Sequence, residues 1–102
     1  MVLYVMRWDI RQDRAAEYGK WAISALQRLL SAGDVVEFRA YRPVSGANEV
    51  AVTYEFGDMP AFGRWYQNET VQRAMQESRE YCENILTEIW GPSPVVPRPV
   101  RP

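Results

Sequence analysis

The sequence has 102 residues, of which 47% are hydrophobic and 25% are charged, as expected for one globular domain. Its formal net charge of -1 argues against a nucleic-acid partner and against binding to an anionic membrane. No apolar run is long enough to span a bilayer, no signal peptide is evident, and the one cysteine, Cys82, cannot form an internal disulfide. We therefore expect a cytoplasmic protein with no membrane partner.

The first 33 residues predict a strand followed by a helix. Residues 2–10 form an apolar run with β-branched and aromatic side chains, which favours a strand. Asp13 is the expected N-cap of a helix over residues 15–30, where apolar residues recur every three or four positions. Gly33 should end this helix, because glycine accepts the left-handed conformation that follows many helices.

A β-hairpin is expected next. Residues 35–42 and 49–56 both alternate apolar and polar side chains, and a turn around Ser45–Gly46 separates them. Pairing Arg39 with Thr53 would place the apolar rows of both strands on the same face of the sheet.

A second helix and a last strand complete the predicted elements. The helix should run from about residue 61 to residue 84, with Asp58 as its N-cap and an interruption or restart near residues 68–70. It includes Cys82, which we interpret as a core residue. Residues 86–90 form the last strand.

The last eleven residues differ in composition from the rest. They hold five of the seven prolines, so they cannot form a helix or an inner strand. We expect a domain over residues 1–91 and an extended, proline-rich tail over residues 92–102, which is either free or laid against a neighbouring subunit.

The order of elements predicts an α+β, ferredoxin-like βαββαβ fold. It would have a four-stranded antiparallel sheet in the order 4-1-3-2 and two helices on one face. The other face would be bare and partly apolar, and such a surface needs a partner. We therefore expect a homodimer that forms through the open face of the sheet.

The stretch Asn48–Phe56, followed by Asp58, Ala61, Trp65 and Asn68, resembles the antibiotic biosynthesis monooxygenase group of the dimeric α/β barrel superfamily. The resemblance implies a homodimer of ferredoxin-like halves, each with a pocket between its sheet and its own helices. Members include cofactor-independent oxygenases that act on aromatic polyketides, and haem-degrading enzymes.

Several functional residues of that group are replaced in this chain. Haem-degrading members hold iron with a helix histidine, but this sequence has no histidine, and the matching position is Met75. The polar residues that the polyketide oxygenases use correspond to Val52, Phe56 and Phe62. We therefore expect no cofactor and no metal, and the resemblance supports the fold more than the reaction.

Five residues are candidates for a ligand-binding site: Arg7, Tyr18, Trp21, Trp65 and Tyr66. Arg7 would anchor a carboxylate or phenolate, while the aromatic side chains would stack on a planar molecule. The alternative is that the aromatic residues are ordinary core and that Arg7 pairs with another charge at the barrel. The sequence leaves open which face of the first strand meets the helices.

Two functions follow from these observations. The first is a homodimeric small-molecule-binding protein that acts on an aromatic or polyketide-like compound, with monooxygenase-like activity. The second is a non-catalytic homodimer that serves as an accessory or interaction module. The sequence does not decide whether the protein is an enzyme.

Overall fold

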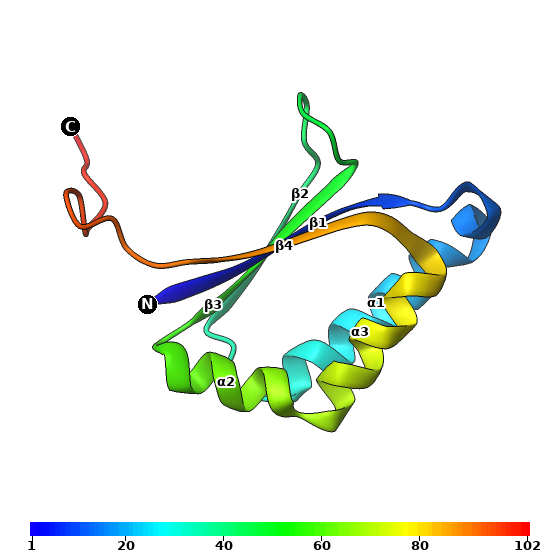
Figure 1. Cartoon of the computed structure of the whole chain (residues 1–102), viewed down its shortest axis with the longest axis horizontal. Helices are drawn as coiled ribbons and strands as arrows, with labels where there is room; N and C mark the ends of the chain where they lie inside the picture. Colours follow the sequence, from blue (N-terminus) through cyan, green and yellow to red (C-terminus); the bar gives the residue numbers. More distant parts are fainter.

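The computed structural model describes residues 1–102 and has the predicted βαββαβ order, with the second helix divided in two (Figure 1). The elements are β1 (Val2–Ile10), a single 3-10 turn η1 (Gln12–Arg14), α1 (Ala15–Ser31), β2 (Glu37–Tyr41), β3 (Val50–Phe56), α2 (Met59–Gln67), α3 (Glu69–Tyr81) and β4 (Cys82–Trp90). None of the helices has the length and apolar character that a membrane-spanning helix needs.

The four strands form one antiparallel sheet in the order β2-β3-β1-β4, which confirms the predicted topology. Arg39 lies opposite Thr53, so the predicted hairpin register is also correct. All three α-helices lie on one face of the sheet, and no element covers the other face (Figure 1). We call this second surface the open face.

The first helix ends as predicted but begins differently. Gly33 follows α1 with a φ of +88°, the left-handed conformation that glycine adopts without strain. Asp13 is not the N-cap, which was the prediction. It lies in the 3-10 turn η1, and its carboxylate accepts hydrogen bonds from Arg11 at 2.9 and 3.1 Å, because the charged guanidinium competes with the helix N-terminus for the same oxygens.

The second helical segment is two helices that meet at Asn68. Asn68 has an extended conformation, and its side chain accepts a 2.8 Å hydrogen bond from the backbone of Thr70, which caps α3. Asp58 caps α2 as predicted, through a 2.8 Å hydrogen bond from Ala61 N. The prediction that the helix continues to residue 84 was wrong, since α3 ends at Tyr81 and the chain turns extended at Cys82.

The core lies between the helices and the even-numbered side chains of β1 and β3. Its centre is Trp65 of α2, which is fully buried and packs against the rings of Tyr4, Tyr54 and Phe56. The indole Nε1 of Trp65 donates a 2.8 Å hydrogen bond to the backbone oxygen of Leu29, which joins α2 to the C-terminal part of α1. This pairing lets a polar nitrogen lie in the core without a lost hydrogen bond.

The chain after β4 contains no helix or strand. Residues 91–102 are exposed and extend beyond the end of the sheet (Figure 1). The side-chain hydrogen bonds in this segment are local, from the backbone nitrogens of Val95 and Val96 to Ser93 Oγ.

Candidate functional site

A cavity of about 220 Å³ lies between α1 and the helix-facing side of the sheet. It is lined by 13 residues, all of them hydrophobic or aromatic and none of them charged. The aromatic ones come from β1, α1, β2 and β3, and they are Trp8, Tyr18, Trp21, Phe38 and Tyr54. Such a lining suits a planar apolar molecule.

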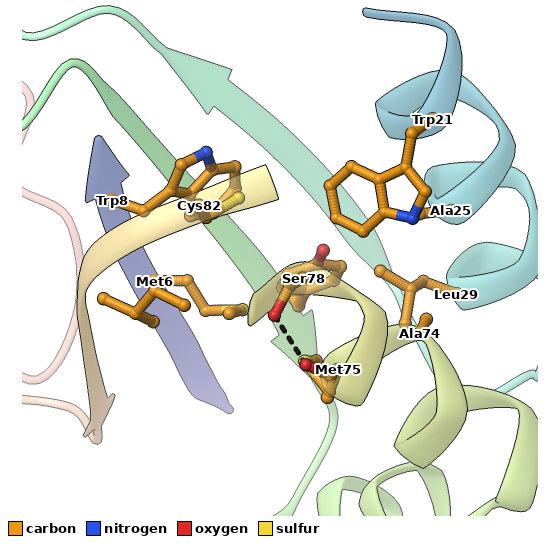
Figure 2. Close-up of a pocket in the computed structure, with 11 residues that line it drawn as sticks. Met6, Trp8, Trp21, Ala25, Leu29, Ala74, Met75, Ser78 and Cys82 are labelled. Atoms are coloured by element: carbon orange, nitrogen blue, oxygen red, sulfur yellow. Dashed lines mark hydrogen bonds between the residues drawn. The ribbon is translucent and has the colours of Figure 1, made fainter. Parts of the chain in front are cut away.

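A smaller chamber of about 40 Å³ adjoins this cavity and shares five of its residues: Trp8, Trp21, Ala25, Leu29 and Tyr54. Trp8 and Trp21 face the chamber from opposite sides, with Ser78 and Cys82 between them (Figure 2). Burial raises the pKa of the Cys82 thiol to about 12, so this sulfur is neutral at pH 7. The Ser78 hydroxyl donates to the backbone oxygen of Met75 at 2.6 Å. Neither side chain is an activated nucleophile.

Two tyrosines supply the hydroxyl groups of the main cavity. Trp8 Nε1 donates a 2.9 Å hydrogen bond to the Tyr18 hydroxyl, which links β1 to α1. Burial raises the pKa of both Tyr18 and Tyr54, so both phenols are uncharged at neutral pH. They can donate hydrogen bonds to a ligand, but they cannot serve as ionised bases there.

An ion pair between α1 and α3 lies beside Trp21, one of the aromatic residues of the cavity. Glu77 accepts hydrogen bonds from Arg28 at 2.6 and 3.0 Å, and from Trp21 Nε1 at 3.0 Å. The Trp21 ring also stacks on Tyr81, with centroids 4.7 Å apart and planes within 10°. Contacts with α3 therefore fix the orientation of the indole that forms one wall of the cavity.

Tyr18 and Trp21 lie at the cavity, but Trp65 and Tyr66 do not. Trp65 belongs to the core described above, and Tyr66 is 39% exposed and stacks on Phe62 with a centroid distance of 5.4 Å. These two residues contribute to packing around α2. The expected grouping of all four aromatic residues in one pocket was therefore wrong.

Arg7 also lies away from the cavity, on the open face. It forms an ion pair with Glu88 of β4 at 3.0 Å and borders an open hollow of about 500 Å³ that also contains Arg39 and Glu55. Alternation along β1 explains this placement, since Trp8 points toward the helices and its neighbour Arg7 must point to the other side. The expectation that Arg7 anchors a ligand beside the helix aromatics is therefore contradicted.

Sequence reasoning missed Trp8, Phe38 and Tyr54 as cavity residues. Two of them could have been predicted from the hairpin register, because it places Phe38 directly opposite Tyr54 on the helix-facing side. A tyrosine in a row of otherwise apolar strand residues carries a hydroxyl that needs a partner when buried. This feature distinguishes Tyr54 from its neighbours.

The cavity can bind and orient a molecule, but it holds no ionised group for acid–base chemistry. The structure contains no cluster of three or more Cys, Asp or Glu side chains that could hold a metal ion. The chemistry that the site offers is stacking on aromatic faces and hydrogen-bond donation by neutral phenols.

No known family model matches the sequence, and no curated protein is significantly similar to it. Solved structures do match. A dabb family protein with a ferredoxin-like fold from Mesorhizobium loti is 16% identical, with a TM-score of 0.80 over 90% of this chain and 96% of that one. SnoaB, a cofactor-independent oxygenase from Streptomyces nogalater, is 14% identical, with a TM-score of 0.74 over 95% and 97%.

A dimeric ferredoxin-like protein of unknown function from Thermobifida fusca is 11% identical, with a TM-score of 0.72 over 87% of this chain and 88% of that one. An antibiotic biosynthesis monooxygenase also matches in structure. The chain thus has the ferredoxin-like fold of dabb and antibiotic biosynthesis monooxygenase proteins, which confirms the predicted resemblance at the level of the fold. At these identities the likeness does not extend to the reaction.

Proposed function

We propose that this chain is a homodimeric protein that binds a small aromatic molecule in the cavity between α1 and the sheet. The observation that carries the proposal is the lining of this cavity, which holds no charged side chain and is rich in aromatic rings from four elements. Empty apolar space of this size would leave the surrounding side chains without packing partners, and a ligand would supply those contacts.

The volume of the cavity limits the ligand. Pockets for drug-sized ligands measure about 300–1,000 Å³, whereas the cavity has about 220 Å³ and the adjoining chamber about 40 Å³. A compound of one or two aromatic rings therefore suits the site better than a large polyketide.

The homodimer is proposed on the open face. Leu86 and Trp90 of β4 lie on this face and are half exposed, and Leu3 of β1, which pairs with Trp90, is partly exposed beside them. A second copy packed on this face would bury these apolar side chains. The Thermobifida fusca protein, which has the same fold, is dimeric.

Catalysis as a cofactor-independent oxygenase is a second candidate function, favoured by the likeness to SnoaB. The ligand would then react with oxygen inside the cavity. Oxygen consumption in the presence of bound aromatic compounds measures this activity directly, and binding without consumption favours a carrier or accessory role.

Filling the cavity tests the binding site. Ala25 is buried on α1 and lines both chambers, so Ala25→Leu places a larger side chain in the space for the ligand. Ala16 is exposed on the same helix, and Ala16→Leu is the matched control. We expect a naphthalene derivative to shift the NMR signals of cavity residues in the wild type and in Ala16→Leu, but not in Ala25→Leu. Absence of shifts in the wild type would refute binding.

A further inference from the structure

The hydroxyl group of Tyr54 makes no hydrogen bond with any protein group, although the residue is only 3% exposed. Tyr54 lies on the central strand β3, where its ring packs between Phe38 and Trp65 with centroid distances of 5.1 and 5.0 Å. Arg28 Nε is the one fully enclosed side-chain nitrogen or oxygen that lacks a partner. The oxygen of Tyr54 is not among these fully enclosed atoms, so it still touches open space, and the spaces that this residue lines are the main cavity and the smaller chamber.

An unpaired phenol inside a protein is unusual, because the large majority of buried polar side-chain atoms have a hydrogen-bond partner. None of the other residues that line the main cavity carries a charged or amide side chain. The missing partner must therefore enter from the cavity, as part of a ligand or as water.

The remaining polar atoms of the cavity show what kind of group is missing. Trp8 Nε1 donates a hydrogen bond to the oxygen of Tyr18. The hydrogen of the Tyr18 hydroxyl is therefore free to be donated, like that of Tyr54. Both tyrosines therefore present O–H donors. No cation lines the cavity to balance the charge of a carboxylate or phenolate, and burying such an anion without a partner is costly.

A neutral oxygen that accepts a hydrogen bond, carried by an apolar aromatic ring system, would pair with a tyrosine hydroxyl and would bring no charge into the cavity. We propose, building on the small-molecule binding proposed above, that the cavity selects aromatic ketones, with the carbonyl oxygen accepting a hydrogen bond from the hydroxyl of Tyr54. The aromatic part of the ketone would lie among Trp8, Trp21 and Phe38.

Three ligands of matched shape test the proposal by NMR titration of the purified full-length protein: 2-acetonaphthone, 2-ethylnaphthalene and 2-naphthoate. The ketone should bind about 3- to 10-fold more tightly than the hydrocarbon, as one net hydrogen bond allows. The carboxylate should bind most weakly, because its charge would be buried without a cation.

The variant Tyr54→Phe removes the hydroxyl and keeps the ring. It should bind the ketone and the hydrocarbon with equal affinity, while its affinity for the hydrocarbon stays that of the wild type. Tyr41→Phe is the control, since Tyr41 is exposed on β2 away from the cavity. This control should keep the preference for the ketone.

A second measurement does not need a variant. Ketone labelled with ¹³C at the carbonyl should show a downfield carbonyl shift when bound to the wild type, because a hydrogen bond polarises the carbonyl group. Equal affinities for ketone and hydrocarbon, with no carbonyl shift, would overturn the selectivity and leave the binding function standing. Failure of all three ligands to bind would overturn both.

Discussion

Trp8 of β1 and Tyr18 of α1 are joined by a 2.9 Å hydrogen bond from the indole Nε1 to the phenol oxygen, at the edge of the apolar cavity. The two residues are only ten positions apart in sequence, yet they belong to the two layers between which the cavity lies. The bond therefore helps to set the separation of α1 from the sheet.

Replacing Tyr18 with Phe tests the role of this bond in stability. The change leaves the partly buried Trp8 Nε1 without an acceptor, which costs about 1–2 kcal/mol of unfolding free energy. Urea denaturation measures the loss. Tyr41→Phe, at an exposed site on β2, should stay within about 0.5 kcal/mol of the wild type. If both variants unfold like the wild type, water replaces the Tyr18 oxygen and the bond does not contribute.

The fold was predictable because each element carries its own local signal. The hairpin register followed from two alternating rows, and Asp58 capped α2 where the sequence placed it. The face of β1 was not predictable, since both Tyr4 and Met6 on one side and Leu3 and Val5 on the other are apolar. Only the pairing of β1 with β3 and β4 and the position of the helices decide between the two sides.

The same uncertainty explains the errors in the predicted site. Arg7 was expected beside the aromatic residues of the helices but lies on the open face, and its partner Glu88 is 81 residues away, a contact that no local pattern reveals. Trp21 and Trp65 both lie on apolar helix faces, so spacing alone cannot tell cavity from core. The difference is tertiary, because Trp65 is enclosed by aromatic rings of β1 and β3 while Trp21 borders open space.

Glu77 makes stability depend on pH. Hydrogen bonds from Arg28 and Trp21 hold the pKa of its carboxyl group at about 2, below the ordinary value of 4.5. A pKa that is lower in the folded state stabilises the fold above the unfolded value, and this contribution is lost as the pH falls from about 4.5 toward 2.

The variant Glu77→Gln should accordingly be less stable than the wild type at neutral pH, by about 1–2 kcal/mol because partial exposure screens the ion pair. The difference should shrink as the pH falls toward 2, which thermal unfolding across this range measures. Glu80→Gln is the control at an exposed position of the same helix. A difference that stays constant with pH would contradict the assignment of the lowered pKa to Glu77.

A charge on the open face should break the proposed homodimer. Leu86 is 51% exposed on β4 and lies opposite Arg7, so Leu86→Glu changes this face without disturbing the core. Val36 is 64% exposed before β2, and Val36→Glu is the control. Light scattering at micromolar concentration should give a dimer mass for the wild type and Val36→Glu and a monomer mass for Leu86→Glu. A dimer mass for Leu86→Glu would place the interface elsewhere.

Removing the proline-rich tail tests both the domain boundary and the contacts of the tail. The segment after Gly91 has no regular structure, and its side-chain hydrogen bonds are internal, so a chain that ends at residue 91 should keep the unfolding free energy of the full chain within about 0.5 kcal/mol. Denaturation at a concentration high enough to keep both proteins dimeric makes this comparison. The dimer dissociation constant, measured by dilution, is the separate readout for docking. An unchanged constant indicates a free tail, whereas a weaker dimer with unchanged secondary structure indicates that residues 92–102 lie against the partner subunit.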